Sequence, residues 1–342
     1  MLLLKADKKF WIGLGISLFS LILLLRRIEI YDLAAAFVEL DVKYLAPAVF
    51  SIFLSYYLRA LRWHYLLLPV KKCSMIKVFP ITIIGLMVNG LLPARVGELV
   101  RAYLLAEREN LSKGSVLATL VLDRLADVLC LLLLLLATLF LSDFPNASEK
   151  GRKGLIIGGL ITLAIFSTVI FILALLRARK IPIPGVNSRI LKCLPRSIAR
   201  NAIRGFDSFV DGLRLPVKLA NAIGITWTTI LAWLFSIVPV HLLLWSFGIF
   251  LPITASMLIL VMLAFAVMLP ATPGYIGTYH YACFSALRAF DVPEGKALSL
   301  ALIVHAVSFV PVILAGFYCL WKDGFSLRRL KIEDGMTKRM DE

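Results

Sequence analysis

Acidic residues are scarce in this sequence. It holds 21 Asp and Glu against 37 Lys and Arg, so its formal net charge is +16. Charged residues make up only 17% of the 342 residues, whereas 60% are hydrophobic. In a soluble protein such a charge would first suggest nucleic acid. In so apolar a chain, basic loops that face anionic lipid explain the excess, and no nucleic-acid partner is expected.

Paired cysteines and the common catalytic motifs are also missing. The spacing of the cysteines includes no CxxC and therefore indicates neither a disulfide framework nor a zinc site. They are Cys73, Cys130, Cys193, Cys283 and Cys319. The four histidines have no metal-like spacing, and there is no GxSxG, HExxH or Walker sequence. We therefore expect no cofactor and no metal. Without an ATP site, any transport would be downhill or ion-coupled.

Long apolar runs are abundant. The mean hydropathy is +0.90, and the runs are too long and too many for the core of a soluble domain. We predict an all-α polytopic membrane protein. Its full crossings are predicted at residues 10–25, 44–68, 115–141, 155–176, 219–245 and 297–321. The first follows three lysines without a small-residue cleavage pattern, so we predict a retained span and not a signal peptide.

Two further regions, 76–110 and 252–290, predict broken or re-entrant hairpins. Each is apolar up to a Leu-Pro-Ala and then continues as a more polar helical segment. Three pairs match at an offset of 177 residues: Pro93 with Pro270, Ala94 with Ala271, and Gly97 with Gly274. The topology makes the hairpins enter from opposite faces. The sequence therefore predicts an inverted repeat, with repeat 1 at about 44–141 and repeat 2 at about 219–321.

Loop charges predict the orientation. On the same side as the loop 177–218 and the tail 322–342 lie 28 of the 37 basic residues, so both termini are expected in the cytoplasm. One basic helical stripe within that loop consists of Arg189, Lys192, Arg196, Arg200 and Arg204. It predicts an amphipathic helix that binds anionic inner-leaflet lipids. A cytoplasmic linker packed on the membrane domain is the alternative.

Charged residues follow the break in the first hairpin. In NGLLPARVGELVRAYLL, Arg95, Glu98 and Arg101 recur every three residues along one helical face. The acid can orient the two guanidinium groups, which can fork onto phosphate oxygens. The motif begins at Asn89, and the Leu-Pro-Ala at Pro93 would place this face at depth, which predicts a site for a lipid phosphate. An ordinary salt-bridged cytoplasmic helix is the alternative.

The span 115–141 contains three charged residues, Asp123, Arg124 and Asp127, ahead of a purely apolar run. An ionisable group inside a span costs roughly 2.5 to 3.5 kcal/mol on insertion scales, so it persists where it is paired or lines a polar cavity. We predict that Asp127 fixes Arg124 and that Arg124 faces substrate. Structural pairing alone is the alternative.

The second hairpin offers neutral groups. Residues that break the helix and allow close backbone approach are Pro270, Pro273, Gly274 and Gly277. Freed amides near the start of the following helix would point at an anion. Further hydroxyl and imidazole donors are predicted at Thr272, Tyr275, Thr278, Tyr279 and His280. His305, 181 residues after Arg124, ranks second, because a buried histidine is more often a packing residue.

Three segments carry a resemblance to a known family. NGLLPARVGELVRAYLL, LDRLADV and PATPGYIGTYH resemble the family named after the transmembrane region of lysylphosphatidylglycerol synthase, the flippase portion of bacterial multiple peptide resistance proteins. The motifs span residues 89–280, and the hydropathy extends the match over nearly the whole chain. Relatives commonly carry Pro-Gly-Gly where this chain has Pro273, Gly274 and Tyr275, and often an arginine where it has His305. These departures bear on headgroup chemistry.

The resemblance implies a flippase of a prokaryotic cytoplasmic membrane, acting on anionic or aminoacylated phospholipids or on polyprenyl-linked lipids. No aminoacyltransferase domain is expected, since about twenty residues follow the last span. A membrane enzyme that transfers a group to or from a lipid carrier, with Asp123 or His280 as base, is a second hypothesis. The third is a noncatalytic partner of a separate synthase, docked at 189–204. A homodimer is the alternative to such a separate protein partner.

Overall fold

The computed structural model describes residues 40–92, 95–141, 218–268 and 273–322, with isolated residues between 157 and 213. Within these ranges all regular structure is helical. The first group of elements is η1 (Val42–Tyr44), α3 (Leu45–Leu67), α4 (Met75–Leu91), α5 (Gly97–Glu109) and α6 (Lys113–Leu141). The second group is α9 (Leu219–Ser246), α10 (Ile253–Met268), η4 (Pro273–Tyr275), α11 (Thr278–Arg288) and α12 (Glu294–Lys322).

Four stretches are long and apolar enough to cross a membrane. They are Val42–Leu67, Lys113–Leu141, Leu219–Ser246 and Glu294–Lys322. Each agrees with a predicted crossing to within three residues. The predicted crossings at 10–25 and 155–176 lie outside the described residues, as does the basic stripe at 189–204. The prediction of an all-α polytopic membrane protein is confirmed.

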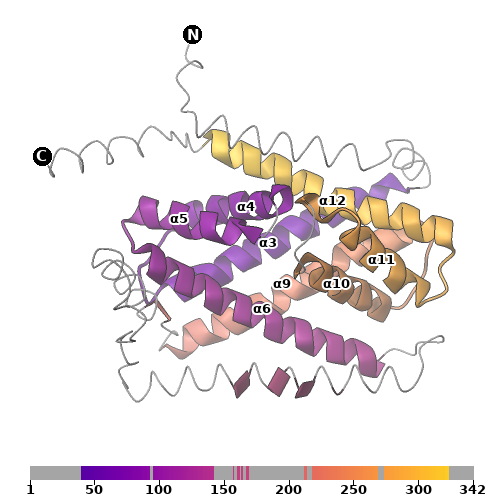
Figure 1. Ribbon diagram of the computed structural model, residues 1–342, viewed down its shortest axis with the longest axis horizontal. Coiled ribbons are helices and arrows are strands. Elements are labelled where there is room, and N and C mark those ends of the chain that lie inside the picture. The colour runs from indigo at the N-terminus through magenta and orange to yellow at the C-terminus, as the bar shows by residue number, and fades with distance from the viewer. Residues whose placement is uncertain are drawn as a thin grey trace, which may run out of the picture.

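The two predicted hairpins are pairs of short helices, α4 with α5 and α10 with α11. Helix α4 ends at Leu91, because a proline disfavours helical backbone at the residue before it and Pro93 follows. The second break contains Gly274 and Tyr275, both with left-handed backbone at φ 70° and 56°. Figure 1 shows α4 and α5 at one end of the long helices and α10 and α11 at the other.

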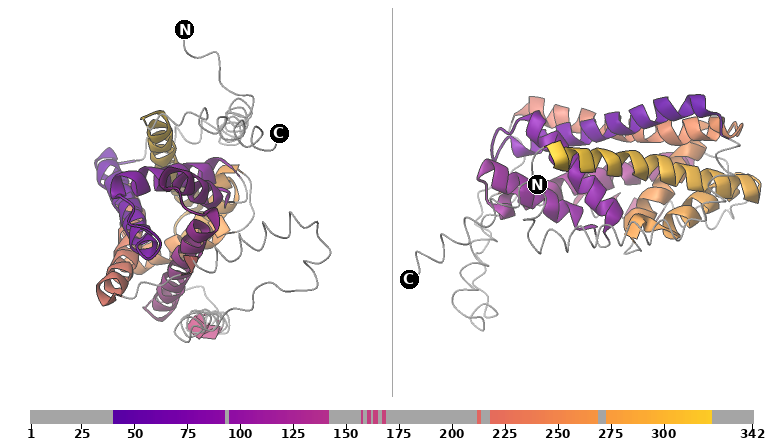
Figure 2. Two further views of the ribbon diagram at one scale, coloured as in Figure 1. Left: turned by 90° about the vertical axis from the view of Figure 1, so that its left-hand side faces the viewer. Right: turned by 90° about the horizontal axis from the view of Figure 1, so that it is seen from above.

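Each α-helix contact made by one repeat has an equivalent contact made by the other. Helix α4 packs on α12, and its counterpart α10 packs on α6. The two first helices of the repeats, α3 and α9, pack on each other along the molecule (Figure 2). The last helices, α6 and α12, are both 29 residues long. This symmetric set of contacts is the arrangement expected of an inverted repeat.

Serines allow close approach between α3 and α9. Ser55 Oγ donates a hydrogen bond to the Ala232 carbonyl at 2.9 Å and lies 2.8 Å from Ser236 Oγ. Ser51 Oγ donates to the Phe235 carbonyl at 2.8 Å. Small hydroxylated residues are common where membrane helices meet, because they let the backbones approach and satisfy their own polar atoms. The two repeats are therefore joined at a polar crossing near the centre.

Candidate functional site

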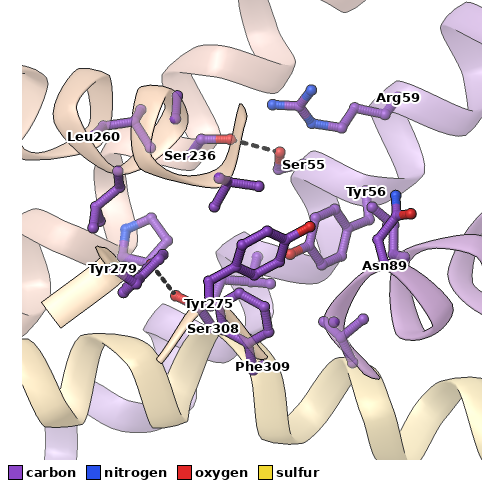
Figure 3. Close-up of a pocket in the computed structure, with 18 of the residues that line it drawn as sticks. Ser55, Tyr56, Arg59, Asn89, Ser236, Leu260, Tyr275, Tyr279, Ser308 and Phe309 are labelled. Carbon is purple, nitrogen blue, oxygen red and sulfur yellow. Dashed lines mark hydrogen bonds between the residues drawn. The ribbon is translucent and has the colours of Figure 1, made fainter. Parts of the chain in front are cut away.

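A cavity of about 260 Å³ lies where the two repeats meet. Of the described α-helices, all but α5 contribute to its wall, and most of the wall is aliphatic or aromatic. Its charged lining residues are Arg59, Arg95, Arg124 and Asp127. Figure 3 shows Arg59 and Asn89 on one side of the cavity, with Tyr279 and Ser308 on the other.

Asp123 is the enclosed centre of an arginine network. Its Oδ1 lies 2.7 Å from Arg62 Nε, and neither side chain is exposed. Its Oδ2 lies 3.0 Å from Arg124 Nη2 and 3.7 Å from Arg101 Nη1. Asp123 does not line the cavity. Its geometry is that of a group that neutralises and orients the surrounding cations.

Asp127 connects the network to the cavity. Its Oδ1 accepts hydrogen bonds from Arg59 Nη1 at 2.8 Å and Arg62 Nη1 at 2.9 Å. The indole of Trp233 donates to the same oxygen at 3.2 Å. Its Oδ2 lies 3.3 Å from Arg124 Nη1. Asp127 therefore contacts Arg124, and Arg124, 32% exposed, lines the cavity.

The first hairpin adds Arg95 and Glu98. Arg95 Nη2 lies 3.4 Å from Glu98 Oε1, and Arg124 Nη1 lies 3.7 Å from the same oxygen. Asn89 holds the carboxylate by donating from Nδ2 to Glu98 Oε2 at 3.0 Å. Its Oδ1 accepts from the backbone amide of Gly97 at 2.7 Å, which closes the break between the two helices. The hairpin thereby brings Arg95 to the cavity.

Arg101 takes a different position from Arg95. Its guanidinium lies over the ring of Trp63, 4.3 Å from the centroid, and the side chain is buried away from the cavity lining. Gly85 makes room for it, because a Cβ at this position would collide with the Arg101 side chain. The i, i+3 spacing predicted that Arg95 and Arg101 share one phosphate-binding face. In the structure Arg95 lines the cavity, whereas Arg101 lies in the protein interior.

The network has a surplus of positive charge. Five guanidinium groups stand against three carboxylates, a formal balance of +2. The arginines are Arg59, Arg62, Arg95, Arg101 and Arg124, and the acids are Glu98, Asp123 and Asp127. Buried charges require compensation, so a cationic surplus facing the cavity favours an anionic ligand there.

Neutral groups from the second repeat line the far side of the cavity. Tyr275 and Tyr279 belong to the second hairpin, and Ser308 to α12. Tyr279 donates a hydrogen bond to Ser308 Oγ at 3.3 Å. His305 is buried outside the cavity lining, where its Nε2 donates to the Gly274 carbonyl at 2.7 Å. This bond holds the left-handed turn that presents Tyr275.

Three other predicted site residues of this hairpin, Gly277, Thr278 and His280, do not line the cavity. Thr278 Oγ1 donates to the Tyr275 carbonyl at 3.2 Å, and Gly277 caps α11 with φ 90°. His280 packs edge-on against His305, 4.7 Å between ring centroids. The side-chain contacts of Pro273 and all contacts of Pro93, Pro270 and Thr272 lie outside the described residues. The adjoining turn η4 contacts α4, so the breaks of the two hairpins approach each other.

Arg59 and Arg62 were missed as site residues by sequence reasoning. Their segment, YYLRALRWHYLL, lies in a predicted crossing, and the charge count assigned both to the cytoplasmic side, with Arg124 as the one basic residue inside a span. The structure places both within α3. The signal was present, because arginine inside an apolar helix is itself an indication of function or pairing.

Comparisons with known proteins agree with the fold. The family described as the lysylphosphatidylglycerol synthase TM region matches residues 10–316, and the chain belongs to that family. Similar proteins include two UPF0104 membrane proteins of Methanocaldococcus jannaschii. One is 20% identical over 76% of this chain and 78% of its own length, the other 23% identical over 67% and 91%. A UPF0104 membrane protein of Methanothermobacter thermautotrophicus is 26% identical over 77% and 79%. No solved structure matches significantly.

Proposed function

We propose that the protein translocates a lipid with a phosphate-containing headgroup between the leaflets of a prokaryotic cytoplasmic membrane. The observation that supports this most directly is the central cavity, whose mostly apolar wall has one cationic end. A phosphate at that end would contact guanidinium groups that are shielded from bulk water, where charge interactions are stronger than in solution.

The size of the cavity favours a headgroup as its occupant. Its volume of about 260 Å³ lies near the lower end of small-molecule sites, which are roughly 300–1,000 Å³. A phosphate with a small substituent suits that volume, whereas two acyl chains do not. We therefore propose that the headgroup occupies the cavity while the chains remain in the bilayer.

The inverted repeat offers a mechanism for exposing the cavity alternately to the two leaflets. Its wall draws on both repeats, with Arg59 and Arg124 from the first and Tyr275 and Phe309 from the second. In proteins of this design, rocking of one repeat against the other opens a central site first to one side and then to the other. The polar crossing of α3 and α9 lies at the join between the moving halves.

Lipid movement in reconstituted vesicles tests the proposal. Phosphatidylcholine vesicles would contain a trace of fluorescent phosphatidylglycerol, and quenching of the outer leaflet would report transbilayer movement. We expect faster movement with the protein than without it. Arg124→Gln should slow that movement about tenfold or more, because a hydrogen bond to a charged group contributes roughly 1.5–3 kcal/mol. Arg95→Gln should act in the same direction with less effect on folding, since its ion pair among the described residues is with Glu98 alone.

Lys72→Gln provides the matched control, because it removes one exposed positive charge outside the cavity lining. Its rate should equal that of the wild type. Equal movement in vesicles with and without protein would overturn translocation as the function. Wild-type rates in both cavity-arginine variants would overturn the role of the cationic end.

A further inference from the structure

The cavity has a second polar region, opposite its arginines. Tyr275, Tyr279 and Ser308 line this side without any formal charge. Figure 3 shows the hydroxyls of Tyr56 and Tyr275 directed into the cavity between the two polar sides. The hydroxyl groups of Tyr56 and Tyr275 therefore lie between the cationic end and the neutral side of the cavity (Figure 3).

The repeat relates the neutral region to the charged one. Ser308 in α12 stands 181 residues after Asp127 in α6, and His305 stands 181 residues after Arg124. Ser55 and Ser236 have the same separation and touch at 2.8 Å where α3 crosses α9. Positions that are charged in the first repeat are thus occupied in the second by neutral groups. The two halves of one cavity have different binding chemistry on the same framework.

Most polar atoms around the neutral region are already used within the protein. His305 Nε2 is bonded to the Gly274 carbonyl, and the Tyr279 hydroxyl is bonded to Ser308. The Tyr275 hydroxyl is different, because it has no hydrogen-bond partner among the described residues although the side chain is only 5% exposed. Leaving a buried hydroxyl without a hydrogen-bond partner is destabilising, and a bound partner would offset that cost.

We infer that the Tyr275 hydroxyl binds an uncharged, hydroxyl-bearing substituent on the phosphate of the translocated lipid, such as a glycerol or a sugar. The inference rests on the proposed function, because the arginines must hold the phosphate for its substituent to reach Tyr275. The hydroxyl of Tyr275, which lies between the two polar sides of the cavity (Figure 3), then recognises a neutral oxygen of that substituent.

The charges around the cavity oppose a cationic substituent, such as an aminoacyl group. Asp127 is the one carboxylate among the described residues that line the cavity. It is already in ion-pair contact with Arg59, Arg62 and Arg124. An added ammonium would enter a site with a surplus of positive charge and no uncommitted acid. The site thus selects against such lipids by charge as well as for hydroxyl groups by hydrogen bonding.

Matched lipids test the inference in the vesicle assay. Phosphatidylglycerol, phosphatidylpropanol and lysylphosphatidylglycerol would have identical acyl chains and the same fluorophore. The first two have the same charge and differ only in the hydroxyls of the headgroup. We expect the wild type to move phosphatidylglycerol about three- to tenfold faster than phosphatidylpropanol, the range expected for one hydrogen bond. Lysylphosphatidylglycerol should be the slowest.

Tyr275→Phe removes only the hydroxyl and should abolish the preference, so that phosphatidylglycerol and phosphatidylpropanol move at equal rates in this variant. The control is Tyr281→Phe, at a tyrosine of the same hairpin that is 73% exposed, and it should keep the preference. Equal wild-type rates for the two anionic lipids would overturn the inference and leave the proposed function intact. So would retained preference in Tyr275→Phe, or faster movement of the lysyl lipid. Failure to move any of the three lipids would overturn the proposed function itself.

Discussion

Arg62 Nε lies 2.7 Å from Asp123 Oδ1, and both side chains are completely enclosed between α3 and α6. Enclosing two charges is costly, so an ion pair of this kind adds little net stability over a well-packed apolar pair. Removing one partner is different, because it leaves the other charge buried and uncompensated. We therefore expect this contact to set the relative position of the two helices, and the cavity arginines with them.

Asp123→Asn should lower the free energy of unfolding by about 3–5 kcal/mol, the usual cost of breaking a buried ion pair. Thermal unfolding of the purified protein in detergent measures the change. The double variant Arg62→Met with Asp123→Asn should recover part of the loss, because it also removes the guanidinium that has lost one of its two carboxylate partners. A single variant as stable as the wild type would show that the carboxylate is not needed to compensate its arginines.

Gly97→Ala should open the first hairpin. A Cβ at this position would collide with the carbonyl oxygen of Gly85 and the side-chain oxygen of Asn89. Because that oxygen accepts the Gly97 amide, the change should disturb Asn89 and Glu98 together. We expect a loss of about 1–3 kcal/mol in stability, as for other overpacked sites, and slower lipid movement.

Gly295→Ala is the matched control for Gly97→Ala. Gly295 lies in the first turn of α12, where an added Cβ would meet open space. Unfolding temperature and lipid movement should both stay at or slightly above wild type, since alanine favours helix over glycine. If the two glycine variants behaved alike, close packing at the hairpin would not explain the effect.

A pH-sensitive contact lies at the far end of the first hairpin, away from the spans. Glu109 is buried, with carboxylate oxygens 2.7 Å from Lys77 Nζ and 2.9 Å from Lys71 Nζ. Hydrogen bonds from Lys77 and Lys71 lower the pKa of the Glu109 carboxyl. A lowered folded-state pKa contributes stability above the unfolded-state value and loses it as the pH falls through the folded-state value.

Glu109→Gln should remove this contribution. At neutral pH the variant should be less stable by about 1 kcal/mol, a modest value because both lysines are half-exposed. The difference from wild type should disappear as the pH falls below the ordinary carboxyl range near 4. Unfolding temperatures of both proteins across pH 3.5–7 measure it. A constant difference across that range would assign the effect to packing and not to charge.

Much of the fold is readable from local pattern. The long apolar runs located four spans to within three residues, because the bilayer thickness sets helix length regardless of what the helix packs against. The two hairpins were likewise visible as apolar runs interrupted by proline and glycine. Asp123, Arg124 and Asp127 stood out for a related reason, since ionisable groups in so apolar a helix require partners.

Partner identity was not readable in this way. Arg59 and Arg62 come from α3, more than sixty residues before the carboxylates they contact. Arg95 and Arg101 have the same local pattern, yet one faces the cavity and the other stacks on Trp63. That difference depends on the contact of α5 with Gly85 in α4. Local periodicity defines a helical face but not the neighbour that the face meets.

The opposite insertion of the two hairpins gives a prediction of sidedness. Ile76 begins the first hairpin and is 84% exposed, and Phe250 precedes the second and is 80% exposed. In a cysteine-free background, single cysteines at these positions should react with a membrane-impermeant maleimide from opposite sides. Loop charges predict that Ile76 lies on the cytoplasmic side, so intact cells should label Phe250→Cys only, and permeabilised cells both. Ile259→Cys, at a fully buried position, should stay unlabelled. The reverse labelling pattern would mean that the protein has the opposite orientation in the membrane, with the inverted repeat preserved. Labelling of both positions from one side would contradict the inverted arrangement, on which alternate exposure of the cavity depends.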